Sequence, residues 1–240
     1  MSVTDDTLLG GRVHLRQPKD GYRAAIDPVL LAAAVKAKAR DRVLDVGCGT
    51  GAAMFCLAAR IPSIDISGLE IQPNLAALAT QGLTLNHLEA RARIMVGDLA
   101  ALPDIVCASP FDIVMTNPPF GPDGTVSPKA SVASAHHESH VSLNQWITAC
   151  LKLLKPKGRF VMIHRADRLS EIMAALSLSC GDIQVTPIFP KASQPAKRIV
   201  IDAGKGRQTG DTIHAGIVLH SENGPYTTQA EAILRDAQPI

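Results

Sequence analysis

Short apolar runs alternate along this chain with longer segments in which apolar residues recur at helical spacing. The short runs are about six residues long, a length typical of buried strands. The predicted strands are residues 42–47, 64–71, 93–98, 111–116, 159–164, 183–189 and 196–203, followed by an extended piece over 212–220. The predicted helices are residues 29–40, 50–62, 73–88, 142–155 and 168–179. This alternation predicts an α/β fold with a doubly wound, mostly parallel sheet.

The order of elements changes near the C-terminus. The strands at 183–189 and 196–203 have no helix between them, so we expect an antiparallel hairpin at the edge of a seven-stranded sheet. The 240 residues suffice for one large core, and we expect a single domain over residues 1–240. Residues 1–40 are expected to be an N-terminal extension packed on it, in which Asp27 caps a helix and Pro28 follows as its first residue.

The composition, 46% hydrophobic and 19% charged, is that of a soluble globular chain. The chain shows no basic segment followed by an apolar run at its start and no stretch of about 18 apolar residues, so we expect neither a secretory signal nor a transmembrane helix. The five cysteines are scattered and form no CxxC pair, which disfavours a disulfide framework or a zinc knuckle and favours the reducing cytoplasm.

The net charge of +2 is unevenly distributed. It is +3 over residues 1–40, −4 over 41–135 and +3 over 136–240. The segment 187–207 holds one acid, Asp202, and several basic residues: Lys191, Lys197, Arg198, Lys205 and Arg207. An acidic middle between basic flanks is compatible with a nucleic-acid surface, and the cluster is equally compatible with an ordinary solvated face.

The segment 45–51, DVGCGTG, joins the first strand of the predicted sheet to the next helix. Glycines allow a sharp turn and a close approach of the backbone to a ligand, here near a helix N-terminus. Glu70 closes the next strand, where a carboxylate could accept from a ribose diol, and Asp98 with Leu99 could flank an adenine ring. Together with Asp45, these acids meet at three consecutive strand ends, which predicts a nucleoside cofactor.

The glycine spacing by itself leaves the cofactor open. Residues 47–52 also fit the GxGxxA pattern of dinucleotide-binding proteins, the glycines could form a structural turn, and Asp98 could cap a helix. S-adenosylmethionine is favoured over NAD because Asp45, placed before the glycines, suits a cationic methionine end better than a pyrophosphate. The chemistry expected after the fourth strand also favours it.

The predicted strand 111–116 leads into the sequence Asn117-Pro118-Pro119-Phe120. The two prolines fix two φ angles and remove two backbone donors. The Asn117 carboxamide oxygen and the Pro118 carbonyl can each accept one hydrogen of an NH₂ group, and Phe120 can stack on a base for about 1–3 kcal/mol. The segment therefore predicts a preorganised site for an amine or amide beside a methyl donor, and its alternative is a rigid turn that ends a strand.

The motifs DVGCGTG, GLEI, VGDLAAL and TNPPF, in this order and spacing, resemble those of amino-group class I methyltransferases. LLGGRVHLRQPKDGYRAAIDPVLLAA before the glycines, and HHESH, LLKPKG and LHSENGPYT after NPPF, resemble more narrowly the bacterial family of tRNA-valine adenine-N6 methyltransferases. The resemblance covers nearly the whole chain. It implies the Rossmann-like class I methyltransferase fold, S-adenosylmethionine as the cofactor, and the adenine 3′ of the anticodon of a valine tRNA as the substrate.

The resemblance also implies roles for individual residues. The expected cofactor-binding residues, in or beside these motifs, are Asp27, Asp45, Gly47, Cys48, Gly49, Gly51, Glu70, Ile71, Asp98, Leu99 and Asn117, with segment 20–28 closing over the methionine end. The expected catalytic residues are Asn117, Pro118, Pro119 and Phe120, which bind the target adenine. The chain has only eight aromatic residues, so we expect RNA binding to depend mainly on charge.

Some other residues attract attention without carrying a strong prediction. HHESH at 136–140 is not HExxH and lacks an evident third ligand, so we expect a substrate-contacting or solvated loop and no metal. Cys48 suits a small packing residue better than a reactive thiol. The pair 164–165 could border the substrate cleft, and the segment 205–207 could touch phosphates or form a surface turn.

Three functions fit these observations. The first is S-adenosylmethionine-dependent methylation of the N6 amine of adenine in RNA, with tRNA favoured. The second is methylation of a protein glutamine amide, as in release-factor methyltransferases, which usually have tyrosine at the position of Phe120 and a separate N-terminal helical domain. The 44 residues before Asp45 are too few for that domain. The third is a non-catalytic cofactor-binding module, which the intact 117–120 segment disfavours.

Overall fold

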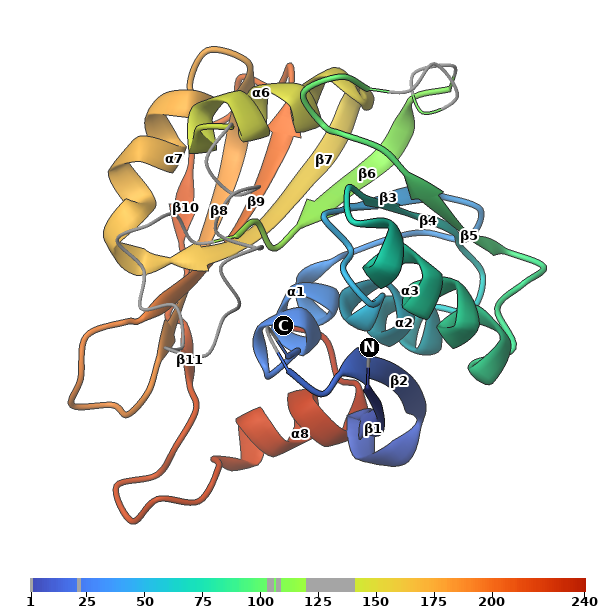
Figure 1. Cartoon of the computed structure of the whole chain (residues 1–240). Helices are drawn as coiled ribbons and strands as arrows, with labels where there is room; N and C mark the ends of the chain where they lie inside the picture. Colours follow the sequence, from blue (N-terminus) through green and yellow to red (C-terminus); the bar gives the residue numbers. More distant parts are fainter. Residues whose placement is uncertain (1, 21–22, 103–105, 107–108, 120–140) are drawn as a thin grey trace.

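The computed structural model of this chain describes residues 2–20, 23–102, 106, 109–119 and 141–240 (Figure 1). The strands of its main sheet are β3 (Arg42–Val46), β4 (Asp65–Glu70), β5 (Ala92–Val96), β6 (Phe111–Thr116), β7 (Leu154–Arg165), β8 (Cys180–Phe189), β9 (Arg198–Lys205), β10 (Thr212–Ile213) and β11 (Ile217–Val218). Within the described residues, the strand order is β10-β8-β9-β7-β6-β3-β4-β5, and β11 also pairs with β8.

The direction of the strands agrees with the sequence-based prediction. The strands β5, β4, β3, β6 and β7 are parallel, whereas β9 lies between β7 and β8 and runs antiparallel to both. The seven predicted strands are the long strands of this sheet. The piece expected to be extended over 212–220 is instead two strands of two residues, each parallel to β8. The prediction of a doubly wound, mostly parallel α/β sheet with an antiparallel edge is confirmed.

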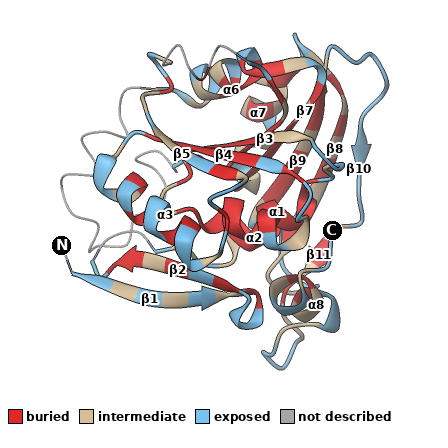
Figure 2. Ribbon diagram, turned by 90° about the vertical axis from the view of Figure 1, so that its right-hand side faces the viewer, coloured by how far each residue is buried: buried red, intermediate tan, exposed pale blue. Residues whose placement is uncertain are grey.

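Helices cover both faces of the sheet (Figure 1). One face carries α1 (Asp27–Ala34), α2 (Ala52–Arg60), α3 (Pro73–Leu85) and α8 (Thr228–Asp236), and the other carries α6 (Leu143–Lys152) and α7 (Leu169–Leu176). The alternation along β7 shows why both faces are apolar: Val161 and Ile163 join one hydrophobic cluster, while Phe160 and Met162 join the other. Burial is greatest along the sheet and the helix faces against it (Figure 2). No helix among the described residues is long and apolar enough to span a membrane.

The N-terminal segment contains a hairpin that the apolar pattern did not reveal. β1 (Val3–Leu8) and β2 (Val13–Pro18) pair antiparallel around the short helix η1 (Leu9–Gly11). The hairpin is fixed to α3 because the Asn86 side chain accepts from His14 N at 2.8 Å and donates to His14 O at 2.7 Å. After the hairpin, α1 is buried along seven of its eight residues, so the N-terminal segment contributes directly to the core.

Several predicted boundaries were wrong. The helix expected over 29–40 ends at Ala34, and the strand expected to begin at residue 159 begins at Leu154. An irregular register with β6 accommodates the proline and glycine that were expected to end the preceding helix. Asp27 is not the N-cap of α1: Ile26 holds that position without a side-chain cap, and the Asp27 carboxylate pairs with Arg198 instead. α8, which is polar overall, was not predicted at all.

Candidate functional site

The glycine loop, residues 47–51, lies between the end of β3 and the start of α2. Gly47, Gly49 and Gly51 have φ angles of 72°, 57° and 92°, a region that L side chains rarely adopt. The first two N–H groups of the loop donate to Leu69 O at 2.8 and 3.1 Å, which folds the loop over the end of β4. A Cβ added at Gly49 would meet no atom within 4 Å, so a ligand could approach the backbone there.

Glu70, the last residue of β4, holds this loop through its carboxylate. Its Oε2 accepts from Gly49 N at 2.8 Å, and its Oε1 accepts from Gln72 N at 2.8 Å. The side chain is buried, which raises the pKa of Glu70, although the backbone donors lower it. Each carboxylate oxygen has a second lone pair, so Glu70 could still accept a hydroxyl group from a ligand.

Asp45, on β3 just before the glycine loop, is a buried acid whose second oxygen has no donor among the described residues. Only 2% of the residue is exposed, and Oδ2 has no hydrogen-bond partner there. Burial raises the pKa of Asp45 to about 7, a bond from the Met54 backbone opposes this rise, and the charge of Glu70 adds to it. A ligand ammonium group beside Asp45 would donate to Oδ2. It would also lower the pKa of Asp45, because a nearby positive charge favours the charged carboxylate. The residues present therefore fit the cationic methionine end of S-adenosylmethionine.

The remaining residues predicted at the cofactor differ in their exposure. The Asp98 carboxylate accepts from Ala100 N at 2.8 Å and so forms a local turn, beside the buried Leu99. Ile71 is 41% exposed at the end of β4. Cys48 is buried, its sulfur lies 2.6 Å from where a Cβ at Gly68 would be, and burial raises the pKa of its thiol. The Cys48 side chain is therefore a packing residue.

Asn117, Pro118 and Pro119 leave the sheet next to the glycine loop. β6 pairs with β3 so that Thr116 lies opposite Val46, the residue before Gly47. Asn117 is half-buried, Pro118 is buried and Pro119 is exposed. Phe120 lies outside the described residues, as does the HHESH segment. The glycine loop and the first three residues of NPPF thus leave the same edge of the sheet from neighbouring strands.

Trp146 on α6 is a residue that the sequence reasoning missed. Its Nε1 donates to Thr116 Oγ1 at 3.0 Å, and Thr116 Oγ1 donates to Val46 O at 2.8 Å. A Cβ added at Gly47 would lie 3.2 Å from two carbons of the indole ring. The sequence signal that could have identified Trp146 is that it is the only tryptophan of the chain, but its role depends on contacts formed in the folded protein.

Asp27 lies at the same edge of the sheet, held by an ion pair. Arg198 Nε donates to Asp27 Oδ2 at 2.9 Å, and the Asp27 side chain is 14% exposed. Arg198 begins β9 opposite Arg165, the last residue of β7, so this pair lies at the carboxyl end of the parallel strands. The structure thus brings the first turn of α1 to the edge where Gly47 and Asn117 lie.

The basic segment 187–207 does not form one surface. β9 carries Arg198 and Lys205 to its opposite ends, which are about 23 Å apart at 3.3 Å per residue. Lys205 donates to Leu151 O near the end of α6 and to Leu154 O at the start of β7, and Arg207 pairs with Asp182. The side chains of Lys205 and Arg207 thus bind groups of the protein itself, at the amino ends of the parallel strands and far from Gly47.

His164 does not border an open cleft. It is 2% exposed near the end of β7, and burial together with the charge of Arg168 lowers its pKa to about 4. The neighbouring Arg165 pairs with Asp167. This histidine is therefore neutral at ordinary pH.

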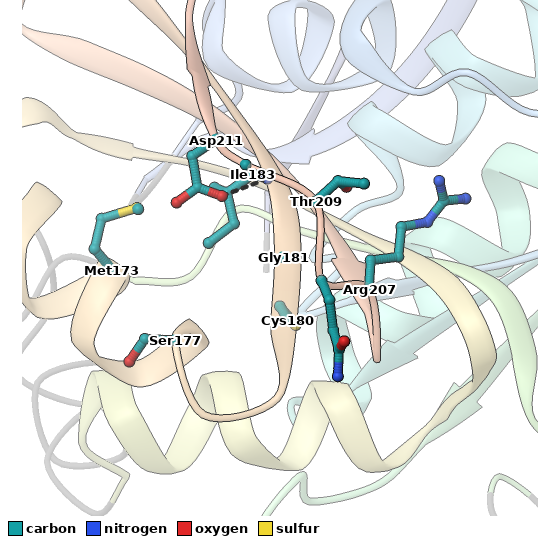
Figure 3. Close-up of a pocket in the computed structure, with 10 residues that line it drawn as sticks. Met173, Ser177, Cys180, Gly181, Ile183, Arg207, Thr209 and Asp211 are labelled. Carbon is teal, nitrogen blue, oxygen red and sulfur yellow. Dashed lines mark hydrogen bonds between the residues drawn. The ribbon is translucent and has the colours of Figure 1, made fainter.

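A cavity of about 360 Å³ lies at the opposite, amino end of the parallel strands (Figure 3). It lies between α7 and the loop that follows β9, and Met173, Cys180 and Thr209 are among its lining residues. Asp211, which also lines it, accepts from Ile183 N at 3.0 Å. Arg207 also lines this cavity, but none of the described residues predicted to bind the cofactor or to be catalytic does, so we place the candidate active site at the glycine loop instead.

Comparisons with known proteins agree with the fold described above. A family model described as a methyltransferase domain matches residues 37–207. The chain is 26% identical over 216 residues to a tRNA1(Val) (adenine(37)-N6)-methyltransferase of Aeromonas salmonicida, which covers 89% of each chain. It is 31% identical over 156 residues to a protein of the same name from Porphyromonas gingivalis, covering 62% of this chain and 61% of that one.

A solved structure shows the same fold. It is the crystal structure of a predicted O-methyltransferase, protein Atu636 from Agrobacterium tumefaciens, with a TM-score of 0.71 and 24% identity. The likeness covers 86% of this chain and 94% of that chain. It concerns the fold and carries no information about the methyl acceptor.

Proposed function

Because this chain belongs to the class I methyltransferase domain family, whose cofactor is S-adenosylmethionine, we propose that it methylates the exocyclic N6 amine of an adenine in RNA, with tRNA as the substrate class. Relatives that are 26% and 24% identical, over 89% of both chains, bear the name tRNA1(Val) (adenine(37)-N6)-methyltransferase. A target adenine in an RNA loop is easy to extrude because little beyond unstacking opposes it.

The observation that supports this proposal most is the position of Asn117. It follows Thr116, which lies opposite Val46 in the sheet, and Thr116 Oγ1 donates to Val46 O at 2.8 Å. The Asn-Pro-Pro segment therefore begins beside the glycine loop. Two prolines hold its backbone, so a group bound there is held close to the loop without a further loss of chain entropy.

We propose the following roles for the segment 117–120. S-adenosylmethionine, when bound, supplies a methyl group on a cationic sulfur that leaves as a neutral thioether. The carboxamide oxygen of Asn117 and the carbonyl oxygen of Pro118 each accept one hydrogen of the adenine amine, which orients its nitrogen toward the methyl group. These acceptors also stabilise the positive charge that develops on the nitrogen as the new N–C bond forms. The nitrogen then releases one proton to solvent, and Phe120 stacks on the base.

We propose that the acids at the strand ends bind the cofactor. Asp45 receives the ammonium group of the methionine end, which its buried and unbonded Oδ2 suits. Glu70 accepts hydrogen bonds from the ribose hydroxyls through the carboxylate lone pairs that are not used by Gly49 N and Gln72 N. Asp98 and Leu99 flank the adenine of the cofactor, and the glycines let the loop backbone lie against it.

The proposal is tested by incubating the protein with labelled S-adenosylmethionine and total tRNA. After digestion and mass spectrometry, we expect the label in N6-methyladenosine, and we expect the Asn117→Ala variant to incorporate much less. If a cell extract is labelled only on protein, the enzyme methylates an amide instead. If nothing is labelled while S-adenosylhomocysteine still binds, the chain is a non-catalytic cofactor-binding module.

A further inference from the structure

The two loops of the candidate site are linked by one buried hydroxyl. Thr116 is 0% exposed, donates to Val46 O and accepts from Trp146 Nε1. Val46 is the last residue before the glycine loop, and Thr116 is the last residue before Asn117. The chain of hydrogen bonds from Trp146 to Val46 therefore joins the points at which both loops begin.

Trp146 also contacts the glycine loop directly. A Cβ added at Gly47, whose φ is 72°, would lie 3.2 Å from two carbons of the six-membered ring of Trp146. The ring thus lies against the backbone of the first loop residue. The first turn of α6, which carries Trp146, is fixed by a capping box in which the side chains of Ser142 and Gln145 each bond the backbone of the other.

We propose that Trp146 is a positioning residue that sets the glycine loop and the Asn117 segment relative to each other, through Thr116 on one side and Gly47 on the other. This inference rests on the proposed function only in that Asn117 acts on the methyl acceptor. Trp146 touches neither reacting atom in this scheme. It acts by fixing the alignment of donor and acceptor, on which the rate of a transfer reaction depends steeply.

The sharpest test replaces Thr116, because Thr116→Val keeps the shape and removes the hydroxyl. We expect turnover at saturating S-adenosylmethionine to fall at least about tenfold, while the Kd for S-adenosylhomocysteine changes less than about threefold. Thr116→Ser restores the hydroxyl and is expected to keep turnover within about threefold of the wild type. Turnover of Thr116→Val within about twofold of the wild type would overturn the proposal.

A matched control is available in Thr227, whose hydroxyl also donates to a carbonyl and accepts from an amide. Its partners are Val218 O at 2.7 Å and Ala230 N at 3.1 Å. Thr227→Val removes a similar pair of bonds away from the loops, so turnover should be unchanged at a temperature where the variant is folded. An equal loss of turnover in both variants would mean that Thr116 matters only for stability.

A second variant and tryptophan fluorescence provide two further measurements of the role of Trp146. If Thr116→Val does not fold, Trp146→Phe removes the indole donor, and turnover at saturating cofactor should again fall at least about tenfold. Because Trp146 is the only tryptophan, its fluorescence should change as S-adenosylhomocysteine is added to the wild-type protein, whatever the methyl acceptor is. Binding seen by calorimetry without a fluorescence change would contradict the contact with the cofactor loop. A wild-type protein that binds but does not methylate RNA would instead contradict the proposed function.

Discussion

The acidic side chains on the strands themselves have different partners at the two ends of the sheet, whereas Asp27, on α1 at the carboxyl end, pairs with Arg198. At the carboxyl end, Asp45 and Glu70 are 2% and 5% exposed, and burial raises the pKa of both. No lysine or arginine among the described residues forms an ion pair with either of them. Toward the amino end, Arg159 pairs with Asp182 and Asp202 at 2.6 Å, and its bond lowers the pKa of Asp182.

This difference separates structural acids from candidate functional ones. A carboxylate that already has a guanidinium partner is satisfied by the fold and needs no ligand. A buried carboxylate without a cation lowers stability, and a bound cation can offset that cost. The carboxyl end therefore has the electrostatic character of a ligand site, although the cavity of about 360 Å³ lies at the amino end.

Replacing Asp45 tests most directly whether the buried acids at the carboxyl end bind a ligand. In Asp45→Asn the proposed partner of the methionine ammonium is lost, so we expect the affinity for S-adenosylhomocysteine to fall at least about thirtyfold. The cofactor-free variant should be more stable at pH 8, with Tm raised by about 3 °C or more, because a buried charge is removed. Calorimetry and thermal unfolding measure both, and Asp65→Asn, exposed at the other end of β4, is the control. Unchanged affinity would show that the buried carboxylate is not a ligand group.

Asn117→Ala should separate catalysis from binding at the same end of the sheet. We expect turnover to fall at least about tenfold while cofactor affinity is retained, because the amide acts mainly in the transition state. Labelled-methyl transfer and calorimetry measure these two quantities. The control Asn86→Ala loses the bonds to His14 and should lower Tm without lowering turnover. Normal turnover of Asn117→Ala would rule out the proposed role of Asn117.

The pH dependence of cofactor binding should report the titration of Asp45. Its pKa of about 7 in the cofactor-free protein lies above the ordinary value of 3.8. Protonated Asp45 therefore favours the folded protein, and this contribution is fully present below about pH 3.8 and is lost as pH rises from there to about 7. Binding of an ammonium requires the charged form, so affinity for S-adenosylhomocysteine should fall up to about tenfold from pH 8 to pH 6. If the affinity for S-adenosylhomocysteine were equally independent of pH in the wild-type protein and in Asp45→Asn, titration of Asp45 would not be linked to binding.

Arg159→Met should have the smallest effect on function and a clear effect on stability. It leaves the carboxylates of Asp182 and Asp202 without their shared cation, so we expect the free energy of unfolding to fall by roughly 1–3 kcal/mol. Turnover and cofactor affinity should stay within about twofold, because the pair lies away from the glycine loop. Arg235→Met, which breaks a largely exposed pair with Glu231, should change stability by less than about 0.5 kcal/mol. A specific loss of turnover in Arg159→Met would show that the amino end also serves the reaction.

Much of the fold could be predicted because its signals are local. Apolar runs, glycines and prolines fixed the seven long strands and the helices between them, with errors confined to boundaries. The hairpin β1–β2 and the helix α8 escaped prediction because half or more of their residues are polar or exposed. Their apolar residues are buried only by contacts with segments distant in the sequence.

The chemical groups at or near the strand ends could be predicted from the sequence alone: the glycines before α2, Asp45, Glu70, Asp98 and the Asn-Pro-Pro segment. Each follows from a strand that ends where its apolar run ends. Three features depend on the folded chain: Asp45 is buried without an ion-pair partner among the described residues, the basic segment is split between the two ends of the strands, and Trp146 connects Thr116 with Gly47. These outcomes depend on strand order and on helix packing across the sheet. Both are set by contacts between residues far apart in the chain, which local periodicity does not encode.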